Sequence, residues 1–595
     1  MKQLKALLPY LRPYRRSIFW GLTLVVVANA FSIVGPRLIS EGIDAIGRPG
    51  VTRGTIALYA ALSVLAAILG GAGRYGMREI LNGVSRRVET DLRDDFFRHL
   101  LRLDASFYAR TPTGDIMSRA TNDIQAVRMV AGPAYMYLVN MVVVSLFALT
   151  LMVWISPWMT LYSLIPMLAL PPVTLGFGAI IHRQFERIQQ EFGELSTLAQ
   201  ENLAGVRIVK AYGQEEAQAE AFRAMSESYL HRNVEMARVS GLFHPLLGLF
   251  GGMGMVVALL VGGRAIMRGE ITVGEFVEFT LYLAMLMWPM ISLGWVVNLF
   301  QRGAASMGRV SRILETRPAI AEPESPALPA EVRGEIEFRG VSFRYPGTDR
   351  WVLRNVSFRI PAGATAAVVG PTGSGKSTLV SLLARIYDPT AGEVLLDGIP
   401  VRRWPLDRLR AVLGVVPQDP FLFSASIREN LALGFDEPDL RAAEERIRRA
   451  AGIAQLDRTV TQFPAGYDTL LGERGINLSG GQKQRATLAR AIARDPHVLV
   501  LDDALSAVDT HTETEILRGL QGVLEGRTSV IVSHRVTAVM GADLIVVLDD
   551  GEVAETGTHT ELLKAGGAYA MLQRRQLLAE DLDEDPILAL PRWDA

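Results

Sequence analysis

The chain has 595 residues, which exceeds the length of one ordinary domain, and hydrophobic residues make up 49% of it. A net charge of −1 gives no overall basic field, so the composition argues against a nucleic-acid partner. The absence of cysteine excludes disulfides, thiolate metal sites and cysteine nucleophiles. The apolar residues gather in long runs before about residue 302, which predicts a membrane-embedded first half followed by a soluble domain.

Uncharged stretches predict six membrane-spanning helices. A span needs about 20 mostly apolar residues, because a charge in the middle of the bilayer is costly. The stretches without Asp, Glu, Lys or Arg are 17–36, 54–73, 129–182, 239–263 and 279–301. The third is long enough for two helices, with a turn near Ser156 and Pro157. We therefore expect an α-helical transmembrane domain over 17–314, preceded by an amphipathic elbow helix over 1–16 that lies on the membrane surface.

The distribution of arginine predicts the orientation in the membrane. Arginines are frequent between spans two and three and between spans four and five, whereas the opposite loops contain only Arg48, Arg53, Arg264 and Arg268. Positive residues favour the cytoplasmic side, so the N-terminus and the soluble half are expected in the cytoplasm of a multi-pass protein of the inner (plasma) membrane. Within the arginine-rich segments, 84–103 and 184–236 have helical spacing and are expected to extend the spans into the cytoplasm.

The second half of the chain has the pattern of an α/β domain. Residues 315–333 are rich in Pro, Glu and Ala, which predicts an exposed linker. Short β-branched runs then alternate with helices over 334–575, as in α/β folds. The final residues, 576–595, contain an acidic run and are expected to form a solvated tail. No function is assigned to this tail.

A phosphate-binding loop directly follows the apolar strand 366–369 and precedes a helix expected over 379–387. In this strand–loop–helix setting, glycines let backbone N–H groups surround phosphate oxygens, and the helix N-terminus adds a favourable dipole. The lysine reaches the β- and γ-phosphates, and the serine after it ligates Mg²⁺. The predicted ATP-binding residues of this P-loop are Gly370, Pro371, Thr372, Gly373, Ser374, Gly375, Lys376, Ser377 and Thr378.

A second apolar strand, 497–501, ends in Asp502 and Asp503. A carboxylate at the end of a strand beside a P-loop suits a Mg²⁺ ligand, so we assign that role to Asp502. The cofactors predicted from these two motifs are ATP and Mg²⁺.

The motifs in order resemble those of the ATP-binding-cassette (ABC) family. The segment Leu478, Ser479, Gly480, Gly481 and Gln482 is similar to the family's signature. Tyr345 resembles the aromatic that stacks on adenine, Gln418 the Q-loop glutamine that also reaches the metal, and His534 the switch histidine. Residues 471–475 resemble the X-loop of exporters, and 506–509 resemble the D-loop. Six spans followed by one cassette match the half-transporter plan of type IV ABC exporters.

The resemblance implies how such a chain works. Two cassettes dimerise head to tail, and each ATP lies between the P-loop of one chain and the signature of the other. Their closure switches the membrane helices between inward-facing and outward-facing forms. Two segments resemble the coupling helices that transmit this movement, and their matching residues are Gly114, Asp115 and Arg119 in the first and Tyr212, Glu215 and Glu216 in the second.

One residue departs from the family pattern. The family has Glu directly after the Walker B aspartate, where it orients or deprotonates the attacking water, and this chain has Asp503. The shorter side chain predicts weak hydrolysis at a site that keeps His534 and everything needed to bind MgATP. Because the signature is intact, we expect a heterodimer with a second half-transporter that carries Glu after its Walker B aspartate.

Other assemblies and substrates remain open at the sequence level. The alternatives are a slow homodimeric exporter in which Asp503 suffices, and a channel or regulator gated by the cassettes. The six predicted spans exclude a soluble cassette ATPase. Aromatic and methionine side chains in the spans suit amphipathic drugs, lipids or peptides, although the same residues serve lipid interfaces and packing equally well.

Overall fold

The computed structural model describes residues 2–435, 440–536 and 538–584. The chain divides into two compact units. The first contains the residues up to Leu101 together with Thr113–Thr316. The second contains Arg102–Pro112 and the chain from Arg317 onward, so a short segment between two predicted spans groups with the C-terminal half.

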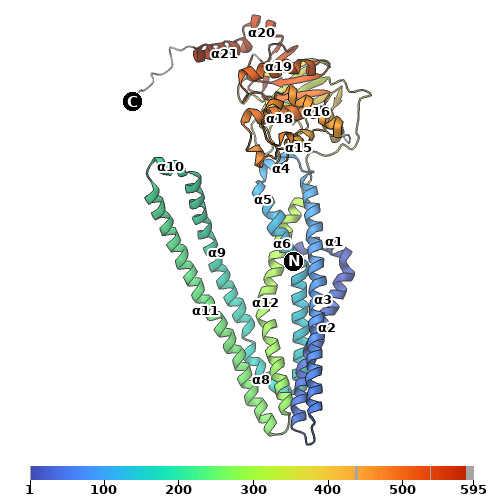
Figure 1. Ribbon diagram of the computed structural model, residues 1–595, viewed down its shortest axis with the longest axis vertical. Helices are drawn as coiled ribbons and strands as arrows, with labels where there is room; N and C mark the ends of the chain where they lie inside the picture. Colours follow the sequence, from blue (N-terminus) through green and yellow to red (C-terminus); the bar gives the residue numbers. More distant parts are fainter. Residues whose placement is uncertain (1, 436–439, 537, 585–595) are drawn as a thin grey trace. The chain divides into compact units, whose positions relative to one another are not determined.

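The first unit is entirely helical (Figure 1). In chain order it contains η1 (Lys2–Leu7), α1 (Leu8–Leu11), η2 (Arg12–Tyr14), α2 (Arg15–Ile46), α3 (Arg53–Leu100), α5 (Thr113–Ser118), η3 (Arg119–Asp123), α6 (Ile124–Met129), η4 (Val130–Ala134), α7 (Tyr135–Ile155), α8 (Pro157–Met167), α9 (Leu170–Ala204), α10 (Val206–Ala211), α11 (Glu215–Met267) and α12 (Val273–Leu314). Within the described residues, six helical stretches are long and apolar enough to cross a membrane, which confirms the predicted number of spans.

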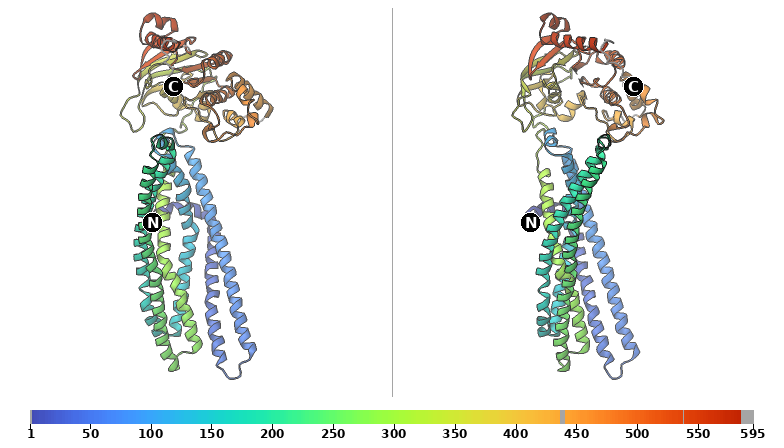
Figure 2. Two further views of the ribbon diagram at one scale, coloured as in Figure 1. Left: turned by 60° about the vertical axis from the view of Figure 1, so that its left-hand side comes forward. Right: turned by 90° about the vertical axis from the view of Figure 1, so that its left-hand side faces the viewer.

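Local signals explain where several of these helices begin and end. Ser156 breaks the third long helix in an extended conformation, and its hydroxyl accepts from the N–H of Met159, so α8 starts at Pro157 as predicted. Gly73 lets α3 approach α2, since a Cβ there would lie 3.0 Å from the Cβ of Ala28. The extensions α9 and α11 run side by side and are joined through α10, as the turned views of Figure 2 also show.

The N-terminal segment is not one continuous helix. It consists of three short pieces, two of them 3₁₀-helical, and only Leu8–Leu11 is α-helical. Pro9 and Pro13 lack the N–H that an α-helical hydrogen bond needs, which accounts for the interruption. Leu7 is nevertheless fully buried within the first unit.

The second unit contains two sheets. The strands are β1 (Ile336–Phe343), β2 (Leu353–Ile360), β3 (Thr365–Val369), β4 (Ala391–Leu396), β5 (Ile399–Pro400), β6 (Leu413–Val416), β7 (Val498–Asp502), β8 (Thr528–Val532), β9 (Leu544–Asp549) and β10 (Glu552–Gly557). A four-stranded antiparallel sheet has the order β2-β1-β4-β5, and a six-stranded sheet has the order β10-β9-β3-β8-β7-β6. This confirms the predicted α/β class.

The second unit also contains helices. They are α4 (Ala105–Arg110), α13 (Lys376–Leu383), η5 (Val401–Arg403), α14 (Leu406–Val412), α15 (Ile427–Ala432), α16 (Leu440–Ile453), α17 (Asp457–Val460), η6 (Gly466–Asp468), η7 (Glu473–Gly475), α18 (Gly480–Ala493), α19 (Thr510–Leu524), α20 (His559–Ala565) and α21 (Ala568–Glu584). Of these, α13, α14, α18, α20 and α21 contact strands of the six-stranded sheet. The inner strands β3, β7 and β8 pair in parallel, and β7 is buried along its whole length, as expected for a sheet covered on both faces.

This topology assembles the site. Strand β8 lies between β3 and β7, so the carboxyl ends of three adjacent parallel strands meet at one edge. The P-loop follows β3, Asp502 ends β7, and His534 comes two residues after β8. Loops at the carboxyl edge of an open α/β sheet are where such folds bind ligands.

Two local predictions need adjustment. The helix expected over 379–387 starts earlier and ends at Leu383, because Arg385 takes a left-handed conformation with φ 48°. The stretch 315–333 has no helix or strand, as expected for a linker. It is nevertheless tied to the second unit, because Ala327 N–H donates to the Arg403 carbonyl at 2.9 Å.

Candidate functional site

The P-loop depends on glycines in conformations that other residues rarely adopt. Gly370 has φ 152° and Gly375 has φ 101°. A Cβ on Gly370 would lie 2.1 Å from the carbonyl oxygen of Leu548, and one on Gly375 would lie 2.6 Å from a methyl carbon of Leu353. The loop therefore combines left-handed backbone with packing that leaves no room for a side chain at either position.

The cradle fits a phosphate group. Lys376 folds back over the loop, where its Nζ donates to the carbonyls of Gly370 and Pro371 at 2.9 and 2.8 Å. Burial lowers the pKa of Lys376, and the nearby carboxylates of Asp503 and Asp502 oppose that shift. The hydroxyl of Ser374 is buried and has no hydrogen-bond partner among the described residues. Phosphate oxygens would satisfy that hydroxyl and give the lysine anionic partners.

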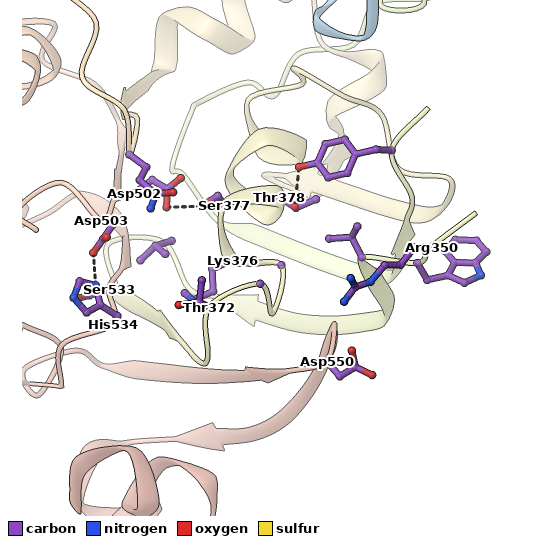
Figure 3. A pocket seen from close by; sticks show the side chains of 17 residues that line it. Arg350, Thr372, Lys376, Ser377, Thr378, Asp502, Asp503, Ser533, His534 and Asp550 are labelled. Carbon is purple, nitrogen blue, oxygen red and sulfur yellow. Dashed lines mark hydrogen bonds and ion pairs between the residues drawn. The ribbon is translucent and has the colours of Figure 1, made fainter. Parts of the chain in front are cut away.

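The predicted metal ligands lie together on one wall of the same cavity. Ser377 Oγ donates to Asp502 Oδ1 at 3.0 Å (Figure 3), and Gln418 also lines this cavity. Asp502 is buried, and burial raises its pKa while the Ser377 hydrogen bond opposes the rise. Hydroxyl, carboxylate and amide oxygens are the hard ligands that Mg²⁺ takes, with phosphate and water completing its shell. The residues therefore fit Mg²⁺.

The other end of the cavity is aromatic. The hydroxyl of Tyr345 lies 3.1 Å from Thr378 Oγ1, and its ring packs edge-on against Phe343 and Tyr387. The whole cavity has a volume of about 420 Å³. Its lining also includes Arg350 and Trp351 from the loop between β1 and β2, and Asp550 from the turn between β9 and β10. Sequence reasoning missed these three residues because neither segment carries a motif.

Asp503 and His534 face each other at the phosphate end. His534 Nδ1 lies 2.8 Å from Asp503 Oδ1 (Figure 3), and both line the cavity. Asp503 has left-handed backbone with φ 48°, so the turn after β7 directs this carboxylate along the carboxyl edge of the sheet. Of the ATP-site residues predicted from the sequence, all except Gly370, Pro371 and Ser374 thus line one cavity.

The signature residues lie elsewhere on the same unit. The described residues that line the nucleotide cavity do not include 478–482. Leu478 is buried, whereas Ser479 and Gly480 are exposed at the start of α18. Ser479 and Gln482 form a capping box, in which Gln482 N–H donates to Ser479 Oγ at 3.3 Å and Ser479 N–H donates to Gln482 Oε1 at 2.8 Å.

The predicted coupling residues belong to the first unit. Gly114 and Asp115 lie in α5, and Asp115 pairs with Arg119 at 2.6 Å. Tyr212 directly follows α10 and is 76% exposed, and Glu215 and Glu216 are the first residues of α11. Apart from Arg119, whose side chain is 19% exposed, these residues lie at exposed helix ends, and none of the six lines the nucleotide cavity.

Sequence reasoning missed the segment that the first half contributes to the second unit. Residues 102–112 carry α4, and Asp104 Oδ1 accepts from the N–H of Ala319 at 2.7 Å. Asp104 also caps α4 by accepting from Ser106 N–H at 3.1 Å. The pattern Asp-x-Ser before an apolar turn was a signal for this short helix, which precedes the expected first coupling segment.

Comparisons with known proteins agree with this geometry. The family model described as the ABC transporter transmembrane region matches residues 18–290, and the model described as ABC transporter matches 353–506. The multidrug resistance-like ATP-binding protein MdlA of Escherichia coli is 36% identical over 578 residues, covering 97% of both chains. YheI of Bacillus subtilis, a probable multidrug resistance ABC transporter ATP-binding/permease protein, is 35% identical and covers 94% of this chain and 95% of its own.

Similarity extends to a lipid transporter and to a solved structure. The ATP-dependent lipid A-core flippase of Syntrophus aciditrophicus is 32% identical, covering 98% of this chain and 96% of its own. The structure of a bacterial Atm1-family ABC exporter with ATP bound superposes with a TM-score of 0.79 at 29% identity, covering 94% of this chain and 98% of that chain. These relatives support ATP hydrolysis with Mg²⁺, coupled to efflux across the inner membrane.

With six membrane helices, a P-loop cavity suited to MgATP and near full-length relatives, the chain belongs to the ABC transporter family, as an exporter half-transporter with a cytoplasmic nucleotide-binding domain.

Proposed function

We propose that this chain is one half of a heterodimeric exporter, in which it retains ATP at a weakly hydrolytic site and completes its partner's active site. The observation that carries the proposal is Asp503, which stands where the family has glutamate. Its carboxylate oxygen Oδ1 lies 2.8 Å from Nδ1 of His534.

The geometry supports binding more strongly than hydrolysis. Aspartate is shorter than glutamate by one methylene, about 1.5 Å, and a displacement near 1 Å can cost on the order of 100-fold in rate. The P-loop, Lys376 and the Ser377–Asp502 pair contain all that is needed to hold MgATP. We infer that this site works as an ATP-dependent clamp between the two cassettes.

The intact signature supports the other half of the proposal. Ser479 is exposed, and its capping box fixes the first turn of α18, which suits contact with ATP held by another chain. In a homodimer both hydrolytic sites would contain Asp503 and both would be weak. A partner with glutamate at this position would combine with Ser479, Gly480 and Gly481 in a productive site.

The proposed substrates are amphipathic drugs, lipids or peptides. Two relatives carry multidrug resistance in their names and another is a lipid A-core flippase. Trp154, Trp158 and Trp288 are exposed on the helices of the first unit and provide apolar contact area. The cysteine-free, arginine-rich composition and Asp503 also resemble the TmrB subunit of the heterodimeric multidrug exporter TmrAB.

The coupling role of the exposed helix ends is part of the same proposal. Tyr212, Glu215 and Glu216 stand where α10 meets α11, and Gly114, Asp115 and Arg119 stand where α5 meets η3. We propose that the segment containing Tyr212, Glu215 and Glu216 docks on the cassette of the partner and transmits the closure of the cassettes to the membrane helices.

The test is the ATPase rate of the full-length chain purified alone and reconstituted in lipid nanodiscs. We expect slow turnover, well below 1 s⁻¹, compared with a typical enzyme median of about 10 s⁻¹. Asp503→Glu should raise that rate about tenfold to 100-fold, because it restores the missing reach toward water. Asp503→Ala provides the baseline.

Turnover of several per second that Asp503→Ala abolishes would refute the weak-site proposal. A rate that Asp503→Glu leaves unchanged would refute it as well, since the methylene would then not limit hydrolysis.

A further inference from the structure

The C-terminal helix α21 holds the backbone of the loop that carries His534. Gln576 Oε1 accepts from the N–H of Val536 at 2.7 Å, and Gln576 Nε2 donates to the carbonyl of His534. A primary amide offers one acceptor and two donors, so this pairing satisfies two backbone groups of the loop with one side chain. The side chain of Gln576 thus bonds one N–H and one carbonyl of the loop, as the backbone of a neighbouring strand would. No strand of the described structure pairs with this loop.

Helix α21 is itself well anchored at its first turn. Glu555 in β10 accepts from the N–H groups of Ala568 and Tyr569, at 2.6 and 3.2 Å. The ring of Tyr569 is fully buried in the cluster that also contains Val536, and its hydroxyl lies 2.7 Å from His559 Nδ1. Residues seven apart lie on the same face of a helix, so burial of Tyr569 directs Gln576 toward the loop.

The loop held by Gln576 leads directly to the nucleotide cavity. The His534 ring lines that cavity and is 53% exposed, and its Nδ1 meets Asp503 Oδ1. On the far side of the loop, Arg535 pairs with the buried carboxylate of Glu513. Gln576 is not among the described residues that line the cavity. It therefore acts on the site through the peptide of His534.

We propose that Gln576 is a positioning residue of the ATP site, whose side-chain amide fixes the His534 peptide so that the imidazole stays at the phosphate end of the cavity. The residue stands at the point where the sequence alone predicts the start of a tail without function. The inference rests on the ATP site of this chain and does not depend on whether the transporter is a heterodimer.

The test measures ATP hydrolysis by the full-length chain in nanodiscs, in an Asp503→Glu background that makes its own site productive. A hydrogen bond contributes about fivefold in an equilibrium or rate, so Gln576→Ala should lower kcat roughly fivefold to tenfold. The KM for ATP should change less than about twofold, because the P-loop and Tyr345 are untouched. Gln573→Ala is the matched control, since it removes the same side chain one turn earlier on α21.

A second measurement separates positioning from a general loss of stability. In a His534→Ala background, Gln576→Ala should cause no further fall in kcat, because the group it positions is gone. Gln576→Glu keeps an acceptor for Val536 N–H but removes the donor to the His534 carbonyl, so it should also lower kcat. Exchange of the Val536 amide should become about fivefold faster in Gln576→Ala.

Three results would overturn the proposal. The first is an unchanged kcat in Gln576→Ala, and the second is a fall in kcat of equal size in Gln573→Ala. The third is a further fall in kcat when Gln576→Ala is added to His534→Ala, as large as the fall that it causes when His534 is present. If Asp503→Glu does not raise the rate, the weak-site proposal fails, and the same Gln576 series is then measured in the unmodified chain. The two failures are therefore distinguishable.

Discussion

At the scale of one residue, the buried carboxylate of Asp502 in the ATP site lowers the free energy of unfolding of its own domain. The carboxyl group is buried, and that burial raises its pKa. A raised carboxyl pKa means that ionisation at neutral pH lowers the free energy of unfolding, and the penalty disappears as the pH falls through the raised pKa. The hydrogen bond from Ser377 compensates for part of this cost.

We therefore expect Asp502→Asn to be neutral or stabilising without nucleotide. At pH 7.5 its thermal midpoint should equal or exceed that of the unmodified chain by up to about 3 °C, since a neutral amide avoids the burial of a charge. The gain should shrink as the pH falls through the raised pKa of Asp502 and vanish only below about pH 3, where the unfolded carboxyl is also protonated. Thermal unfolding with and without MgATP measures both effects. Stabilisation by MgATP should be lost, and a variant stabilised by MgATP like the unmodified chain would contradict the metal role.

The role of some site residues can be predicted from the sequence, whereas the role of others cannot. Lys376, Ser377 and Asp502 belong to motifs whose chemistry requires their spacing, so their meeting in one cavity was predictable. Gln576 was not, because its bonds to His534 and Val536 join segments about 40 residues apart and involve only backbone atoms of the loop. Such contacts leave no residue pattern in the sequence.

At the scale of elements, the start of α18 is fitted closely to the D-loop. Gln484 is buried, and its amide bonds Ser506 Oγ and the N–H of Ala507, both at 2.9 Å. A Cβ on Gly481 would lie 2.7 Å from the carbonyl oxygen of Ala507, whereas a Cβ on Gly480 would meet only the Cβ of Ala507 at 3.6 Å. Two adjacent glycines of one helix thus have different steric demands.

The two alanine variants should separate these demands. Gly480→Ala should be neutral or stabilising by about 0.5–1 kcal/mol, because alanine favours a helix and the space is open. Gly481→Ala should be less stable than Gly480→Ala by about 1–3 kcal/mol, because the D-loop backbone must move. Denaturant unfolding of both variants measures the difference. Equal free energies of unfolding for the two variants would contradict this prediction, because they would show that the D-loop backbone moves away from the new Cβ without loss of stability.

The helices whose bounds depend on the hydrophobic pattern were predicted well. Features that depend on the backbone conformation of one residue or on tertiary contacts were predicted poorly. Five uncharged stretches, one of them long enough for two spans, predicted the six membrane helices found among the described residues. The end of α13 depends on the left-handed conformation of Arg385, which composition does not reveal. The grouping of α4 with the second unit depends on contacts such as Asp104 with Ala319, which are formed only in the folded chain.

At the scale of the whole molecule, the heterodimer that we propose gives two parts of one cassette different tasks. In that proposal the cavity around Lys376 retains ATP, and the exposed signature at Ser479 contacts ATP bound by a second chain. The proposal therefore predicts that a second half-transporter is bound to this chain in its native membrane. Isolation through an affinity tag should yield a second half-transporter in about equal amount. Equal recovery follows only if the dimer contains one copy of each chain, because a homodimer is also head to tail. Recovery of this chain alone would favour the slow homodimer.

The most direct test of the central claim is the identity of the nucleotide retained by that isolated assembly during turnover. After incubation with excess MgATP and rapid removal of free nucleotide, the bound fraction is extracted and its ATP and ADP are quantified. We expect about one intact ATP per assembly, because the site with Asp503 hydrolyses bound ATP more slowly than the partner's site. The Lys376→Ala variant should lose this retained ATP. Retention of ADP alone, or an ATP fraction unchanged by Lys376→Ala, would contradict the claim.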